Sequence, residues 1–182
     1  GLTTVSAGTL KLGATGAGAN TPLGTTGAGT TVTSGATLDL NGFTLATAEA
    51  LTLNGLGVGN TAGALTNSAA GAASYSGAIT QGSASSVVAN NGNMTLSGAI
   101  GGAFGLTLDG TNTGSTLSGI VGIAGGTVTK AGTGTWTLSG VNSYTGATTI
   151  NAGEYKLGGG GTSTTTAFTV NPGGKLTLDN AA

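Results

Sequence analysis

The side chains that could carry out acid–base chemistry are few and scattered along the chain. The 182 residues include five carboxylates and four lysines, and there is no histidine or arginine. General acid–base catalysis requires at least two positioned titratable groups. Asp109 and Asp179 occupy a turn position that Ser or Asn fills in related segments, and Asp39 occupies a position that Thr fills elsewhere. Because neutral residues replace these carboxylates within the same chain, we expect turn or surface roles for them, no catalytic residue and no enzymatic activity.

The same inventory argues against metal, cofactor and nucleic-acid binding. Calcium-binding solenoids carry repeated Gly-Gly-x-Gly-x-Asp segments, and none occurs here. The glycine run at 158–161 lacks the strand–loop–helix setting of a phosphate-binding loop. Four lysines form no basic patch for a phosphate backbone, and no apolar run is long enough for a membrane-spanning helix. The sequence predicts no cofactor, no metal, no nucleic-acid partner and no membrane insertion by this chain.

Composition indicates a chain that packs rather than one that stays unfolded. Glycine (39 residues) and threonine (36 residues) together supply about two-fifths of the chain. Disordered chains pair low hydrophobicity with high net charge, whereas the net charge here is -1 and the mean hydropathy is +0.27. We therefore expect residues 1–182 to form a single domain, either alone or as part of a longer repeat array.

A five-residue unit recurs along this domain. It reads apolar, any residue, Leu, then Ser, Asn or Asp, then Gly or Asn. Alternation of apolar and polar residues is typical of a strand with one buried face, and the residues that follow are turn formers. Six copies lie at 38–42, 51–55, 94–98, 106–110, 136–140 and 176–180, and two variants lie at 10–13 and 155–158.

The apolar positions of this unit define a predicted core. Thr occupies the intervening, outward position in five of the eight copies, at Thr52, Thr95, Thr107, Thr137 and Thr177. Trp136 and Tyr155 stand where other copies have Leu or Met, so we interpret them as large core residues rather than sugar-stacking platforms. The predicted core residues are Leu12, Leu40, Leu53, Leu96, Leu108, Trp136, Leu138, Tyr155, Leu157 and Leu178.

Short strands separated by turns are compatible with an antiparallel sandwich or with a parallel solenoid. Here the strand units span three to five residues and aromatic residues make up only 4% of the chain. The segments at 3–13 and 148–158 agree at 7 of 11 positions. Stacked coils favour equivalent residues at equivalent positions. We therefore predict an all-β, right-handed parallel β-solenoid of about seven to nine coils, each of roughly 20–25 residues.

The segment Lys130–Gly158, KAGTGTWTLSGVNSYTGATTINAGEYKLG, resembles the passenger-associated repeat of bacterial autotransporters. The matching positions include the lysine, the Gly-Thr-Gly turn, the Trp-Thr-Leu strand and the Asn-x-Tyr-Thr-Gly turn, while the role of Tyr144 stays open. The resemblance implies the right-handed hand of the coil, secretion, and a bacterial extracellular or cell-surface location. It brings no catalytic residue with it.

Two classes of function follow from these expectations. The first is structural: a stalk, or the subunit of a self-assembling fibre. For the fibre, repeat-like segments at both ends, without polar caps, would pair head to tail. The second is binding, with the Thr-rich outer face acting as an adhesin. The spacings between the second Leu of successive units range from 12 to 43 residues, and this irregularity argues against an ice-binding plane.

Overall fold

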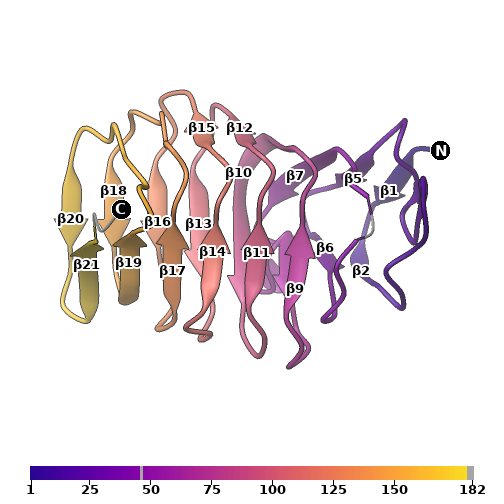
Figure 1. The fold of residues 1–182 in the computed structure, drawn as a ribbon, viewed down its shortest axis with the longest axis horizontal. Helices are drawn as coiled ribbons and strands as arrows, with labels where there is room; N and C mark the ends of the chain where they lie inside the picture. Colours follow the sequence, from indigo (N-terminus) through magenta and orange to yellow (C-terminus); the bar gives the residue numbers. More distant parts are fainter. Residues whose placement is uncertain (46, 180–182) are drawn as a thin grey trace.

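The chain coils into a parallel β-solenoid in which strands of successive coils stack on one another in three columns (Figure 1). The computed structural model describes residues 1–45 and 47–179. Within these residues there is no α-helix, and the one helical turn is the three-residue 3-10 segment η1 (Val58–Asn60). All strand pairings are parallel except that of a small hairpin near the N-terminus.

The first two columns are joined by the long strand β10 (Ile79–Ala89), whose two halves each belong to one column. The first column contains β1 (Thr3–Val5), β5 (Thr30–Val32), β7 (Leu51–Gly55), β10, β12 (Ile100–Gly102) and β15 (Val121–Ile123). The second contains β2 (Gly8–Lys11), β6 (Ala36–Asp39), β8 (Leu65–Asn67), β10, β13 (Leu106–Asp109), β16 (Val128–Lys130), β18 (Thr148–Ile150) and β20 (Phe168–Val170).

The third column begins later in the chain. It contains β9 (Ala73–Tyr75), β11 (Met94–Leu96), β14 (Ser115–Leu117), β17 (Thr135–Leu138), β19 (Gly153–Leu157) and β21 (Gly174–Leu178). In the first coil the hairpin of β3 (Asn20–Thr21) and β4 (Gly24–Thr25) follows β2 instead. Because the second column holds eight strands, the chain makes about seven turns, which confirms the predicted solenoid.

The interior of the coil is filled by ladders of aliphatic residues. One such ladder in the second column runs Leu65, Val87, Leu108, Lys130 and Ile150, each paired with the next across adjacent strands. All five side chains are buried. Because side chains alternate across a parallel strand, each three-residue strand contributes two side chains to the core and one to the outer face.

One corner of the coil is made by glycines that no other residue could replace without movement. Gly77, Gly98, Gly119 and Gly140 follow one another at intervals of 21 residues, where the third column turns into the first. A Cβ on any of them would overlap the backbone carbonyl oxygen of the residue beneath it in the preceding coil. The Ser-Gly turn of the repeat therefore permits close backbone stacking at this corner.

The predicted core residues divide among all three columns, which their sequence pattern did not distinguish. Nine of the ten are buried, and Trp136 and Tyr155 are 1% and 0% exposed. The long interval between Leu53 and Leu96 contains a coil that the sequence pattern did not mark, because Tyr75 takes the position that stacks on Leu96. The tenth residue, Leu178, was predicted to be buried and is 66% exposed. That prediction is wrong, because Leu178 lies in β21, the last strand of its column, where it pairs with β19 on one side only.

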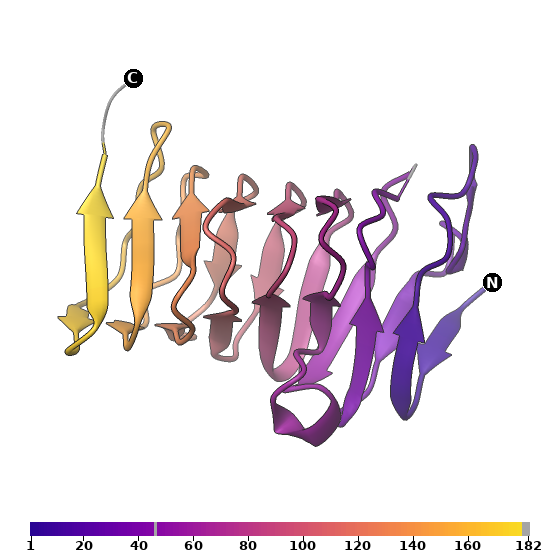
Figure 2. The same ribbon diagram turned by 90° about the horizontal axis from the view of Figure 1, so that it is seen from below.

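The two ends of the solenoid differ in how well the core is covered (Figure 2). Near the N-terminus, Leu23 in the β3–β4 hairpin is 1% exposed, and its carbonyl accepts a hydrogen bond from the Thr3 hydroxyl. At the other end, Val170 is 47% exposed. The prediction of two uncapped ends is therefore wrong for the N-terminal end, where the hairpin covers part of the core.

Candidate functional surfaces and buried polar clusters

Lys130 places a charged amine in the otherwise aliphatic ladder of the second column. The residue is 0% exposed, and its Nζ donates to the carbonyls of Gly132 and, at 3.2 Å, Ala152. Burial lowers the pKa of Lys130 to about 8, although the nearby Asp109 carboxylate acts in the opposite direction. Trp136 Nε1 donates to the Asp109 carbonyl at 3.0 Å. This cluster links three successive coils through main-chain carbonyls, which is a structural arrangement.

Tyr144, whose role the sequence left open, lies inside the coil with 0% exposure. Its hydroxyl lies 2.8 Å from the Tyr155 hydroxyl and 2.7 Å from Thr148 Oγ1. Thr148 Oγ1 in turn donates to Thr165 Oγ1 at 3.2 Å. Burial raises the pKa of Tyr155, so both phenols keep their protons and hold the turn after β17 against the next strand.

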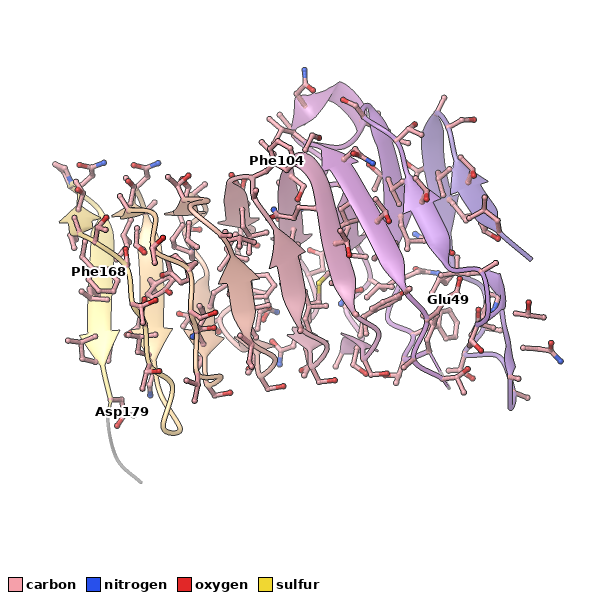
Figure 3. The ribbon with its side chains drawn as sticks, turned by 90° about the horizontal axis from the view of Figure 1, so that it is seen from above. Glu49, Phe104, Phe168 and Asp179 are labelled. Atoms are coloured by element: carbon pink, nitrogen blue, oxygen red, sulfur yellow. The ribbon has the colours of Figure 1, made fainter. Side chains whose placement is uncertain are left out.

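Two carboxylates are buried, which contradicts the expectation of turn or surface roles for all five. Glu49 is 1% exposed and accepts hydrogen bonds from the hydroxyls of Thr21 and Thr30, both at 2.6 Å. The Tyr75 hydroxyl donates to the Glu49 carbonyl at 2.8 Å. Glu49 lies towards the N-terminal end of the solenoid (Figure 3). The sequence gave no signal for this cluster, because Glu49 belongs to no copy of the repeat.

Asp39 is the second buried carboxylate, with 3% exposure. It occupies the outward position of β6, as expected, but Ser68 of the next coil covers it. Asp39 Oδ2 accepts from the Ser68 hydroxyl at 2.6 Å and lies 3.6 Å from Lys11 Nζ, while Oδ1 accepts from the main-chain N–H of Asn41. The group bridges three coils, and each contact joins side chains that the stacking register places side by side.

The outer positions of the strands form rows of threonine. Thr107, Thr129, Thr149 and Thr169 pair in sequence along the second column. In the third column, Ser74, Thr95, Thr116 and Thr137 pair in the same way. The five outward threonines of the repeat, Thr52, Thr95, Thr107, Thr137 and Thr177, are all half-buried, because their backbones lie between neighbouring strands.

Charged side chains on the outer face gather at the C-terminal coils. Lys175 lies 2.9 Å from Glu154, and Lys156 lies 2.7 Å from Asp179. A hydrogen bond from Thr177, followed by one from Lys175, lowers the pKa of Glu154. Both ion pairs are partly exposed and join the last two coils, so each adds little stability on its own.

The described residues contain no group of three or more acidic, His or Cys side chains that could hold a metal ion. No helix in residues 1–45 or 47–179 is long and apolar enough to span a membrane. The depressions on the surface lie at the two ends of the coil, one of them lined by Leu157, Gly161, Leu178 and Asp179. None of these features brings together groups for a chemical step.

The segment that holds the Lys130 and Tyr144 clusters is also the one that matches a known family. Residues 128–154 match the passenger-associated-transport-repeat. This confirms the resemblance stated for Lys130–Gly158, with slightly different limits. No match was found among curated proteins or among solved structures. In its repeat and in its β-solenoid fold, the protein is autotransporter-passenger-like.

The structure explains what this passenger-associated repeat does in the coil. Lys130 ties its own turn to the next coil through carbonyls, and the Gly132–Gly134 turn fits against the main chain of residues 109–112. Asn142 is 0% exposed, and its Nδ2 donates to the carbonyls of Gly140 and Thr162. The residues that characterise the repeat therefore fix its corners, while the apolar residues fill its core.

Proposed function

We propose that this chain is a non-enzymatic structural segment of a bacterial extracellular or cell-surface protein, acting as a stalk or as the subunit of a fibre. The observation that carries the proposal is the passenger-associated repeat embedded in an uninterrupted parallel solenoid. Seven turns at about 4.8 Å per turn give a rod of roughly 33 Å, held by main-chain ladders along its whole length. A rod of this kind suits a spacer.

Self-association is the form of assembly that we propose for the isolated chain. Val170 and Leu178 are 47% and 66% exposed on the last coil, and Phe168 and Asp179 also lie at this end (Figure 3). Strands β20 and β21 each have a partner strand on one side only. Unpaired parallel edges with apolar side chains bind another coil of the same register. Stacking on the opposite end of a second copy gives a head-to-tail contact, and repetition of that contact gives a filament.

Electron microscopy and sedimentation velocity of the purified chain test this proposal. We expect filaments whose length increases with protein concentration. Leu178→Lys, at the exposed end, should shorten them or abolish them. Val141→Lys is the matched control, since Val141 is 64% exposed but lies at a side corner of the coil. A chain that stays monomeric at high concentration, or equal loss of filaments in both variants, would contradict end-to-end assembly.

A further inference from the structure

The third column carries a two-row array of hydroxyl groups across four consecutive coils. One row is Ser74, Thr95, Thr116 and Thr137, at the outward position of β9, β11, β14 and β17. The other row lies two residues further along each strand, at Ser76, Ser97, Ser118 and Ser139. Each row repeats every 21 residues without an insertion.

The register of the array is fixed by main-chain hydrogen bonds under both rows. Thr95 pairs with Ser74 and Thr116, and Thr116 pairs with Thr137, with no shift between strands. The ladder then continues beyond the strands: the N–H groups of Ser97, Ser118 and Ser139 donate to the carbonyls of Tyr75, Leu96 and Leu117 at 3.1, 2.9 and 2.9 Å. Hydroxyls should therefore recur about every 4.8 Å across the strands and about every 6.6 Å along them.

The array is uncharged, and almost all of its hydroxyls are available. No Asp, Glu, Lys or Arg lies in residues 73–76, 94–97, 115–118 or 135–139. Within the part of the chain that the structure describes, the hydroxyl groups of Thr95, Thr116, Thr137 and the four serines accept and donate no hydrogen bond, whereas Ser74 donates to Thr44 at 2.9 Å. Beyond Thr137 the row is interrupted by Lys156, which pairs with it in the next coil.

We propose that this hydroxyl face of the third column binds the surface of ice. A flat, rigid and neutral array of hydroxyls complements a lattice of neutral water molecules, and the strand spacing lies close to the shortest repeat of hexagonal ice. β-Branched threonine side chains keep their hydroxyls in few orientations, so little conformational entropy is lost on binding. The irregular spacings that argued against an ice-binding plane arise from residues on the other two columns and from the N-terminal coils. This inference is independent of the proposed stalk or fibre role.

The alternative ligand of a hydroxyl-rich face is a crystalline polysaccharide. Sugar-binding faces use exposed aromatic rings as stacking platforms. The aromatic residues of these strands, Tyr75 and Trp136, are each 1% exposed and face the core. The absence of rings on the outer side of β9, β11, β14 and β17 favours ice over a polysaccharide.

Ice-affinity partitioning of the full chain, with thermal hysteresis as a second readout, tests the proposal. We expect the unmodified chain to be enriched in the growing ice fraction. Thr116→Lys should lose this enrichment because an ammonium group in the centre of the array cannot join the lattice. The variant should fold, because Lys156 occupies the corresponding outward position of β19. Thr129→Lys, in the outward row of the second column, should partition like the unmodified chain.

Several outcomes would overturn the proposal. The unmodified chain could remain in the liquid fraction and show no thermal hysteresis. Thr116→Lys and Thr129→Lys could change partitioning equally, which would place any ice binding elsewhere. Retention on crystalline cellulose that Thr116→Lys abolishes, without any ice enrichment, would assign the face to a polysaccharide. Circular dichroism of each variant identifies loss of folding, and in that case Ser118→Lys replaces Thr116→Lys.

Discussion

The N-terminal coils and the later coils solve the same stacking problem in different ways. From β1 to β5 the chain advances 27 residues per turn, and from Lys11 to Asp39 it advances 28. From β11 onward the third column advances 21 residues from one strand to the next. The additional N-terminal residues form the β3–β4 hairpin, and further along the chain the loop that contains η1 interrupts the step from β7 to β8.

These irregular coils are held by side-chain hydrogen bonds that the regular coils do not need. Glu49 joins Thr21 of the hairpin to Thr30 of the next coil, and Asp39 joins Lys11 to Ser68. In the regular coils, glycine corners bring main chains together and main-chain hydrogen bonds run under every corner. The comparison indicates that insertions into a solenoid require specific polar partners, whereas a repeated coil is stabilised by repetition itself.

The largest effect is expected in the core of the regular coils. Leu138 is 0% exposed, so Leu138→Asp buries a carboxylate without a partner and should lower the free energy of unfolding by about 4–5 kcal/mol. Urea denaturation measures the change. Leu178→Asp is the matched control on an exposed leucine of the same column and should have little effect. Similar losses in the two variants would contradict the assignment of Leu178 to an open end.

The next effect concerns the glycine corner. Gly98→Ala would drive a Cβ into the Gly77 carbonyl oxygen, and the overlap should cost about 2–3 kcal/mol. Gly101→Ala has no atom within 4 Å of the new Cβ and should be close to neutral. Thermal unfolding of both variants checks this difference. If Gly98→Ala were as stable as Gly101→Ala, close main-chain stacking would not be what holds the regular coils.

Removing the Glu49 carboxylate should destabilise the N-terminal coils alone. Glu49→Ala leaves the hydroxyls of Thr21 and Thr30 without their acceptor in a buried setting, at a cost of about 1–3 kcal/mol for each unsatisfied group. Hydrogen exchange should show faster opening of residues 20–53, with residues 94–138 unchanged, because each coil contacts only its neighbours. Uniform acceleration along the chain would contradict the division into two regions.

The smallest effect is the pH dependence that Lys130 gives to the regular coils. Its pKa in the folded chain, about 8, lies below its ordinary value, so the unfolded chain binds the proton more tightly. Stability should therefore rise as pH increases above about 8, by on the order of 1–3 kcal/mol before the ordinary lysine pKa is reached.

The pH window for this measurement closes near pH 10. Burial raises the pKa of Tyr75 and Tyr155, so ionisation of these tyrosines in the unfolded chain reduces stability above their ordinary pKa. Urea denaturation between pH 7 and 9.5 is the appropriate test. Lys130→Met, which keeps the aliphatic packing, should remove the rise, and a rise that persists in Lys130→Met would assign it to another group.

Much of the regular region could be predicted from sequence because stacking makes equivalent residues recur. Leu96, Leu108 and Leu138 occur in near-identical units, and all three are buried. The passenger-associated repeat was recognisable because its glycines and Lys130 have structural roles that few other residues could fill. By contrast, Tyr75 and Leu117 occupy core positions in the same ladder as Leu96, but their strands lack the full five-residue unit and were not identified.

The sequence by itself determined the period of alternation, the turn residues and therefore the parallel solenoid, since these are local preferences repeated along the chain. Tertiary structure alone decided which column each strand joins, because units of the same pattern lie at Leu40, Leu53 and Leu96 on three different sides of the coil. It also decided the burial of Glu49 and Asp39, since that depends on hydroxyls 19 to 29 residues away. Contacts across one turn of a solenoid join residues whose separation varies with each corner, so local sequence carries no record of them.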